Sequence, residues 1–379
     1  MMTKNSNKIY FPNLNGIRFI AAFLVIIHHI EQFKKILGYE SNWANPVIEQ
    51  IGPLGVILFF VLSGFLITYL LLVEEKQTKT ISIKSFYMRR ILRIWPLYYL
   101  IIILSFFVLS KFSFFNLGEW SSLVFTKFYL KLGFFLLFLP NVALMAFKPI
   151  PFASQTWSVG VEEQFYLIWP ILMRSVKNKK RLLVSIIIFY LTIKLSFFYF
   201  FENYVFWNAK LEILKAVFNS FSIDCMAIGG LFALFLFEKS NLLKLLYSKY
   251  FQTIIFLVLI VFIFKGIQIP YVNFEFYAVL FGILIINLAA NKQTIINLEN
   301  KPFHYLGKIS YGLYMYHPLA IIITLKILYH YNLSNVYIQI SLSVVITILL
   351  ASVSYKYVES YFIKKKNVFT KIISGDQAK

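Results

Sequence analysis

Apolar runs recur along this chain from Ile17 to Tyr361 and are separated by short segments rich in lysine and arginine. A membrane-spanning helix needs about 20 predominantly apolar residues. The hydrophobic fraction is 59% and the charged fraction 14%, whereas soluble domains carry about 45–50% apolar and about 25% charged residues. A soluble core with a single anchor would not distribute the runs in this way. The sequence therefore predicts an all-α integral membrane protein that crosses the bilayer many times.

The runs predict about ten transmembrane helices with both termini cytoplasmic, because basic residues concentrate in the segments that this arrangement places inside. The expected spans are 16–36, 52–73, 95–112, 156–174, 182–201, 215–237, 250–266, 272–290, 305–329 and 335–361. Prolines interrupt the run at 128–147, which is predicted to be re-entrant or interfacial. The expected domains are a cytoplasmic segment 1–15, a single membrane domain 16–361 and a basic cytoplasmic tail 362–379. We expect the first run to be a retained span, without a cleaved signal peptide.

The net charge is +21, from 37 lysines and arginines against 16 acidic residues. In a soluble protein this excess would suggest nucleic acid, but here the basic residues lie between apolar runs, as topology-setting charges do. We therefore expect no nucleic-acid partner. The single cysteine, Cys225, excludes an internal disulfide and a cysteine-based metal site. The five histidines are not at metal-ligand spacing, so no metal is expected.

The first span carries an arginine and two histidines in the sequence NLNGIRFIAAFLVIIHHIEQF. Arg18 and His29 are eleven positions apart, which places them on one helix face about 16 Å apart, while His28 points about 80° away. A buried neutral His29 can act as a general base on a hydroxyl, and Arg18 can hold an anionic group nearer the cytoplasm. The structural alternative is a snorkelling arginine with an interfacial histidine pair.

Three arginines in the block FYMRRILRIWPLYY form a cluster at the cytoplasmic entrance of the expected span 95–112. Arg93 lies four positions after Arg89 and three after Arg90, so the three guanidinium groups share one helix face. Guanidinium groups suit phosphates, whereas topology setting would need only charge, which lysine also supplies. The cluster indicates an anionic ligand, with simple topology setting as the alternative.

Two adjacent carboxylates, Glu162 and Glu163, open an apolar span on the expected outer side, and Tyr166 follows one turn later. Carboxylates at that position must be paired, protonated or in contact with a wet cavity. Either can orient an imidazole or hold a sugar hydroxyl, and a structural pair with a basic residue is the alternative.

Two further groups of polar residues lie within late spans. Ser310, Tyr314 and His317 follow one another at i, i+4 and i+7 and form one stripe, which fits either a ligand contact or a helix-packing hydrogen bond. Asp224 is either a structural acceptor or part of a cavity. The small residues of the second span are expected to serve helix packing; they are Gly52, Gly55, Ser63 and Gly64.

Taken in order, these segments resemble the bacterial membrane acyltransferase-3 family of carbohydrate O-acyltransferases, of the surface-polysaccharide O-acetyltransferase type. The matching blocks are LNGIRFIAAFLVIIHH, FFVLSGFLIT, FYMRRILRIWPLYY, TWSVGVEEQFYLIWP, LGKISYGLYMYHP and SYKYVES, from residue 14 to 360. One block alone is weakly specific, but all of them in order make a strong match. The chain departs from the family pattern at Asn15, where Asp is frequent, at Gly160, where Ser is common, and at Ser360, where Pro often follows the glutamate.

The resemblance implies transfer of an acyl group across the bacterial cytoplasmic membrane. A cytoplasmic acyl-CoA, usually acetyl-CoA, would supply the group, and an exported glycan or lipid-linked sugar, such as capsule, O-antigen or exopolysaccharide, would accept it. Polysaccharide-assembly proteins would be further partners. The family's essential arginine and histidine correspond to Arg18 and His29, its arginine motif to Arg90 and Arg93, its glutamate to Glu162 and its late histidine to His317.

We therefore expect Arg89, Arg90 and Arg93 to hold the CoA phosphates. His29, oriented by Glu162 or Glu163, would either activate the acceptor hydroxyl or take the acyl group first, and the sequence leaves both routes open. The expected supporting residues are Tyr166, Asp224, Ser310, Tyr314 and His317.

Two other kinds of function fit the same residues. A transporter or flippase for a sugar lipid would use the intramembrane polar groups as a pathway, although it would not need an arginine cluster for CoA or release free CoA. A structural partner in a polysaccharide-assembly complex predicts that His29→Ala leaves function intact.

Overall fold

A backbone in lipid must satisfy its own hydrogen bonds, so long apolar runs form helices. The computed structural model describes residues 8–147, 149–203, 209–370 and 372–375, and parts of the expected segments 1–15 and 362–379 lie outside these ranges. The helices are α1 Leu14–Ile36, α2 Pro46–Thr78, α3 Ile83–Ile103, α4 Glu119–Ser122, α5 Phe128–Leu136, α6 Pro140–Ala146, α7 Thr156–Ser175, α8 Lys179–Asn203, α9 Ala209–Phe221, α10 Ile223–Phe237, α11 Leu242–Leu246, α12 Lys249–Phe264, α13 Asn273–Ala290, α14 Lys301–Lys308, α15 Ser310–His330, α16 Val336–Ser354 and α17 Ser360–Lys366.

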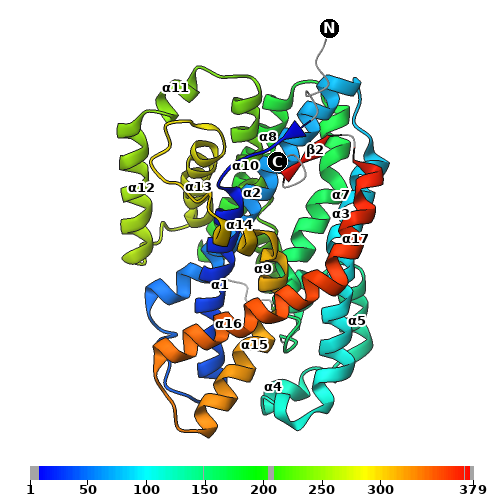
Figure 1. Ribbon diagram of the computed structural model, residues 1–379, viewed down its shortest axis with the longest axis vertical. Coiled ribbons are helices and arrows are strands. Elements are labelled where there is room, and N and C mark those ends of the chain that lie inside the picture. Colours follow the sequence, from blue (N-terminus) through cyan, green and yellow to red (C-terminus); the bar gives the residue numbers. More distant parts are fainter. Residues whose placement is uncertain (1–7, 148, 204–208, 371, 376–379) are drawn as a thin grey trace.

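Short π or 3₁₀ turns extend the ends of some helices. They are Leu104–Val108, Leu109–Lys111 and Ser113–Phe115 after α3, Tyr355–Glu359 after α16, and Asn367–Phe369 after α17. Two short strands, β1 Lys8–Ile9 and β2 Ile373–Ser374, pair in parallel and bring the two ends of the described chain together. Figure 1 shows both strands at one end of the molecule, with α4 at the opposite end. The expectation of an all-α integral membrane protein is confirmed, apart from this small two-stranded element.

Within the described residues, eight helical segments are long and apolar enough to cross a membrane. They are Leu14–Ile36, Pro46–Thr78, Ile83–Lys111, Lys179–Phe200, Lys210–Phe237, Asn273–Ala290, Ser310–His330 and Val336–Phe369. The other two expected spans correspond to α7, which carries two carboxylates, and to the shorter apolar helix α12. The total of ten spans stays a prediction.

The run at 128–147 forms two short helices, α5 and α6, and not one long helix. Phe138 in the turn between them has a positive φ of 57°, and Pro140 begins α6. Gln164 of α7 donates to the carbonyl oxygen of Phe138 at 2.7 Å and to Asn141 Oδ1 at 2.9 Å. A proline at the first helical position favours a new helix start. The interruption expected from the prolines is therefore present, and the turn is fastened to α7.

Close helix approach depends on small residues. A Cβ atom added to Gly64 of α2 would lie 1.9 Å from the carbonyl oxygen of Met226 in α10, and one added to Gly55 would lie 2.7 Å from that of Ala21 in α1. These glycines allow α2 to pack directly against the backbones of α1 and α10, and the expected packing role is confirmed for both. Figure 1 shows α2 and α10 near the centre, with α12 and α13 on one side and α3, α7 and α17 on the other.

Candidate active site

Two histidines from α1 and α15 lie side by side within the helix bundle. Nδ1 of His29 is 3.3 Å from Nε2 of His317, and the ring centroids are 4.8 Å apart. His317 is fully buried, while His29 is half-buried. The structure thus brings together the histidine of the first span and that of the late span, which are 288 positions apart.

Carbonyl oxygens determine which nitrogen carries the proton in the neutral form of each ring. His29 Nδ1 is 2.9 Å from the Val25 carbonyl oxygen, and His317 Nδ1 is 2.6 Å from that of Tyr314. Because a carbonyl oxygen only accepts, Nδ1 is the donor in both rings. His317 Nε2 then presents a lone pair to the His29 Nδ1 proton, and His29 Nε2 keeps a lone pair for another group. A histidine in this state can accept a proton from a hydroxyl.

His28 lies beside this pair but has a different environment. Its ring is buried, its Nδ1 is 2.7 Å from the Ile48 carbonyl oxygen, and its centroid is 4.7 Å from that of Trp43. A Cβ at Gly52 would lie 2.3 Å from the His28 ring, so the glycine makes room for it. These contacts identify His28, a residue of α1, as a side chain packed against the first turns of α2.

A polar stripe on α7, formed by Ser158, Glu162 and Tyr166, leads away from the histidines. Ser158 Oγ is 2.7 Å from the Tyr314 hydroxyl, which donates to the Gln155 carbonyl oxygen at 2.9 Å. The three residues of the stripe are spaced by one helical turn each, so they cover about 12 Å on one helix face. Tyr314 thus contacts the stripe through Ser158, and its carbonyl oxygen contacts Nδ1 of His317. Ser310 is buried at the start of α15, and its side chain makes no hydrogen bond with these groups.

The two carboxylates have their own partners within the stripe region. Glu162 accepts from the Ser63 hydroxyl at 3.1 Å and from the Tyr166 hydroxyl at 2.8 Å. Glu163 accepts from Trp95 Nε1 at 2.9 Å, and its other oxygen is buried without a partner. The expected contact between Tyr166 and a glutamate is therefore confirmed for Glu162.

The expectation that Glu162 or Glu163 orients His29 is wrong. The hydrogen-bond partners of His29 are a backbone carbonyl and His317, because α15 and not α7 faces this ring. The carboxylates also lie nearer the arginines than expected, since Glu163 contacts Trp95, two positions after Arg93. Glu162 lies within electrostatic range of Arg93 on one side and of Tyr314 on the other.

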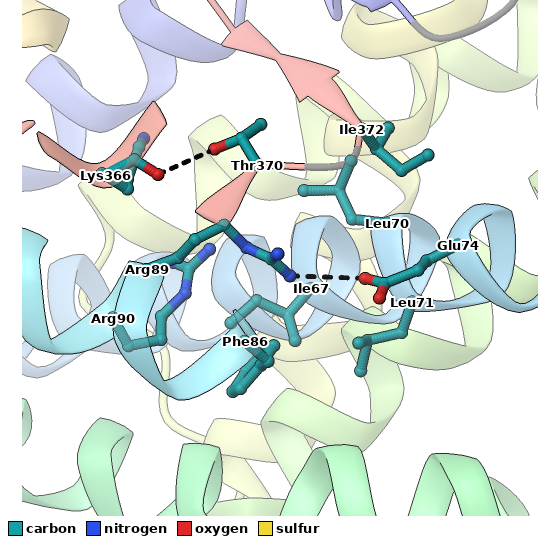
Figure 2. A pocket seen from close by; sticks show the side chains of 10 residues that line it. All are labelled: Ile67, Leu70, Leu71, Glu74, Phe86, Arg89, Arg90, Lys366, Thr370 and Ile372. Atoms are coloured by element: carbon teal, nitrogen blue, oxygen red, sulfur yellow. Dashed lines mark hydrogen bonds and ion pairs between the residues drawn. The ribbon is translucent and has the colours of Figure 1, made fainter. Parts of the chain in front are cut away.

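Arg89 and Arg90 line a pocket at the end of the molecule that carries the strand pair. Ile67, Leu71 and Glu74 of α2 and Phe86, Arg89 and Arg90 of α3 form two sides, and the C-terminal segment forms the third. Figure 2 shows Arg89 reaching across to Glu74, and their charged groups are 3.4 Å apart.

Each arginine of the cluster has a distinct environment. Arg89 also donates to the Phe369 carbonyl oxygen at 2.8 Å. Arg90 lies over the Tyr166 ring, with its guanidinium carbon 5.5 Å from the ring centroid, and its buried Nε has no hydrogen-bond partner among the residues that the structure describes. Arg93 lies within electrostatic range of Glu162 and Glu359. Arg89 is thus held by Glu74 and Phe369, whereas the Nε–H group of Arg90 is left as a donor without an acceptor among the described residues.

Arg18 joins this end of the site. It donates to Asn15 Oδ1 at 2.8 Å, and Asn15 Nδ2 is 3.2 Å from His304 Nδ1. The amide oxygen of Asn15 therefore supplies the acceptor for Arg18, so a carboxylate at position 15 is not required for this contact. Arg18 also lies within electrostatic range of Lys366, which places it with the arginines of α3.

Asp224 is not part of this arrangement. It is fully buried in the first turn of α10, within electrostatic range of Glu275 of α13 and Lys194 of α8. Lys194 and Glu275 form a buried ion pair at 2.6 Å. Asp224 therefore belongs to a separate charged cluster that joins three helices, and its expected supporting role at the site has no structural counterpart.

Several residues of the site are not among the predicted ones. Ser63, expected to serve helix packing, donates its hydroxyl to Glu162. Ser158 lies within a quoted block and Trp95 lies beside the arginines, and the sequence predicts no partner for either. Lys366 belongs to the expected basic tail, and it lines the arginine pocket. The spacing of Ser158, Glu162 and Tyr166 was the available signal for the stripe. Across the part of the chain that the structure describes, no group of three or more metal-ligating side chains forms a metal site.

The geometry describes a helical membrane protein with a cationic pocket at one end, a buried histidine pair deeper in, and polar side chains between them. Residues 11–356 match the family described as "Acyltransferase domain", and the chain belongs to this family. The resemblance seen in the sequence is thereby confirmed. The protein is a multi-pass protein of the cytoplasmic membrane.

Two curated relatives cover almost the whole chain. It is 26% identical to "Peptidoglycan O-acetyltransferase OatA" of Listeria monocytogenes over 98% of this chain and 58% of the relative. It is 27% identical to "O-acetyltransferase OatA" of Staphylococcus aureus over 94% of this chain and 58% of the relative. The chain thus spans a little over half the length of these relatives. No solved structure matches the chain at a significant level.

Proposed function

We propose that this chain transfers an acetyl group from acetyl-CoA, bound at the arginine pocket, to a hydroxyl of a glycan outside the membrane. The observation that carries the proposal is a line of polar side chains inside the bundle, joined by contacts at both ends and by one-turn spacing along α7 between them. It begins at Arg90, follows the stripe of Ser158, Glu162 and Tyr166 along α7, and ends at His317 and His29. Buried polar groups in a membrane protein are costly, and they mark functional pathways.

The cationic end of the path suits the donor. Guanidinium groups bind phosphates through paired hydrogen bonds, and the Arg90 Nε donor has no partner among the described residues. A thioester arm extending from this pocket along α7 would pass Glu162 before it reaches the histidines. Acetyl-CoA is proposed as the donor on this chemistry, with other acyl-CoA molecules as variants for the assay.

The histidine end of the path suits the acceptor. His29 Nε2 would take the proton from the acceptor hydroxyl while the hydroxyl oxygen attacks the acyl carbon. The C–S bond would then break, the new ester would form, and the proton would pass from His29 to the departing CoA thiolate. His317 would hold the His29 ring in the required tautomer through the 3.3 Å contact. In the alternative route the acyl group is first carried on the protein, and both routes give an ester and free CoA.

The names of the relatives bear on the acceptor. Because one relative is a peptidoglycan O-acetyltransferase, peptidoglycan is the first glycan to test, ahead of capsule, O-antigen and exopolysaccharide. These relatives are longer than the present chain, so the test must use this chain itself with each acceptor supplied in turn.

The proposal is tested by release of free CoA from acetyl-CoA by the purified protein in lipid nanodiscs, with glycan fragments added. His29→Ala is expected to lower turnover by roughly 100-fold or more, as for loss of a general base. His330→Ala, an exposed histidine at the end of α15, is the matched control and should keep wild-type turnover.

Three outcomes would count against parts of the proposal. Wild-type protein that neither binds acetyl-CoA nor releases CoA with any glycan would favour the transporter or flippase. Equal turnover in wild type and His29→Ala would remove the role of the histidine. Radiolabelled acetyl groups trapped on the protein in the absence of acceptor would show that the reaction proceeds through an acyl-enzyme and not by direct transfer.

A further inference from the structure

The C-terminal segment is part of the wall of the arginine pocket. Lys366, Thr370 and Ile372 line it opposite the side chains from α2 and α3 (Figure 2). The Thr370 hydroxyl donates to the Lys366 carbonyl oxygen at 3.2 Å, and the Phe369 carbonyl oxygen accepts from Arg89 at 2.8 Å. The pairing of β2 with β1 fastens the segment beyond Ile372. The segment is therefore folded against the pocket.

The ammonium group of Lys366 completes a concentration of positive charge. It lies within electrostatic range of Arg18, Arg89, Arg90 and Arg93, which come from two other helices. Among the pocket-lining residues three are cationic and only Glu74 is anionic, and Glu74 is paired with Arg89. Like charges brought together with partial loss of water repel one another, and a bound anion would offset this repulsion.

Lys366 differs from the lysines beside it on α17. Lys364 and Lys365 are exposed, and the Lys365 ammonium lies 4.3 Å from the Tyr361 ring centroid. Lys366 is half-buried and lines the pocket, and no described carboxylate lies within ion-pair distance of it. Setting the orientation of the helix in the membrane would need only charge and does not explain why this lysine alone turns inward.

We propose that Lys366 is a phosphate ligand of the donor site, acting with Arg89 and Arg90 on a phosphate of the CoA nucleotide. The inference rests on the proposed function and extends it to a residue of the C-terminal segment. The bound phosphate would neutralise the repulsion among the cations and use the free Arg90 Nε donor. A phosphate paired with an ammonium and guanidinium groups forms charge-assisted hydrogen bonds, which are the stronger kind.

The test compares Lys366→Gln with Lys365→Gln in the full-length protein in lipid nanodiscs. Equilibrium binding of radiolabelled acetyl-CoA is expected to weaken roughly tenfold or more in Lys366→Gln, as for loss of one charged hydrogen bond, and to stay unchanged in Lys365→Gln. The KM for acetyl-CoA should rise by the same factor while kcat at saturating donor is kept. Lys366→Arg should restore most of the affinity, which a role in packing alone would not allow.

Dephospho-acetyl-CoA, which lacks the 3′-phosphate, identifies the phosphate. If Lys366 contacts the 3′-phosphate, wild type and Lys366→Gln should bind this analogue equally, and if it contacts the diphosphate the tenfold difference should persist. Either result supports the proposal.

Two outcomes would overturn it. One is that wild type binds and turns over acetyl-CoA while Lys366→Gln does so equally well, which leaves the proposed function intact. The other is that Lys366→Gln changes retention of anionic lipid in the nanodisc but not acetyl-CoA binding, which would assign the lysine to a lipid headgroup. Failure of the wild-type protein to bind acetyl-CoA would instead remove the proposed function itself.

Discussion

At the scale of single residues, the state of His29 depends on partners that lie far apart in the sequence. The Val25 carbonyl oxygen and His317 Nε2 both face its Nδ1, so the lone pair is left on Nε2. His317 is in turn held by the Tyr314 carbonyl oxygen. His317 would not touch the reacting atoms itself. It orients the His29 ring, as the hydrogen-bond partners of functional histidines commonly do.

Replacing His317 by phenylalanine is expected to lower turnover by roughly tenfold to 100-fold, because His29 loses one of the two acceptors near its Nδ1 and only the Val25 carbonyl oxygen still orients the ring. The affinity for acetyl-CoA should not change, since the pocket lies at the other end of the path. The measurement is CoA release at saturating donor, together with equilibrium binding of acetyl-CoA. Wild-type turnover in His317→Phe would show that the contact between the two rings has no role in the reaction.

At the scale of elements, contact between helices depends on glycines and on buried charge. α2 and α10 meet backbone to backbone at Gly64 and Gly229, and a Cβ at Gly229 would lie 2.0 Å from the Val61 carbonyl oxygen. Without a hydrophobic driving force between helices in lipid, such close contacts provide much of the association.

Gly64→Ala is expected to destabilise the protein by about 1–3 kcal/mol, because a Cβ at 1.9 Å from the Met226 carbonyl oxygen forces the two helices apart. The midpoint of thermal unfolding in detergent measures the change. Gly133→Ala in α5 is the control, since an added Cβ there meets no atom within 4 Å. Equal midpoints for the two variants would contradict the packing argument.

The charged cluster of α8, α10 and α13 gives a second prediction at this scale. Lys194→Met leaves the buried Glu275 without its cation, close to Asp224, and is expected to cost about 3–5 kcal/mol. The double variant Lys194→Met with Glu275→Gln should recover part of this loss, because no unpaired charge remains from the pair. Thermal unfolding of the three proteins measures it, and a single variant as stable as wild type would refute a structural role.

At the scale of the whole molecule, the strand pair marks one end and α4 the other (Figure 1). The arginine pocket lies at the end with the strands, since β2 directly follows the segment that lines it. The distribution of lysine and arginine in the sequence predicts that this end is cytoplasmic. A donor made in the cytoplasm would then meet its pocket without crossing the membrane.

This orientation can be tested with thiol labelling of intact cells. The native Cys225 is fully buried and is expected to give little background. A membrane-impermeant maleimide should label Ser122→Cys in α4, which is exposed, and should label Lys244→Cys in α11 only after the cells are opened. Labelling of Lys244→Cys in intact cells, with Ser122→Cys labelled only after the cells are opened, would show that the topology is inverted and that the arginine pocket faces outside.

The class of fold and most residues of the candidate site can be predicted from the sequence alone. Backbone groups in lipid must be satisfied within a helix, so apolar runs of sufficient length led directly to spans, and the prolines near residue 140 led to the broken segment. Helical spacing placed Arg18 with His29 and the three arginines of α3 on shared faces. These relations are local, and the period of the helix is enough to derive them.

Which helix faces meet depends on the packing of the helices in three dimensions. Spacing within α1 could not show that His317 and not Glu162 lies beside His29, because that depends on how α15 and α7 pack around α1. In the same way, Lys366 looks like its exposed neighbours in the sequence, and only the fold of the C-terminal segment turns it toward the pocket. Contacts between helices that are distant in the sequence depend on side-chain packing across several interfaces at once. The spacing of residues within one helix does not predict these contacts.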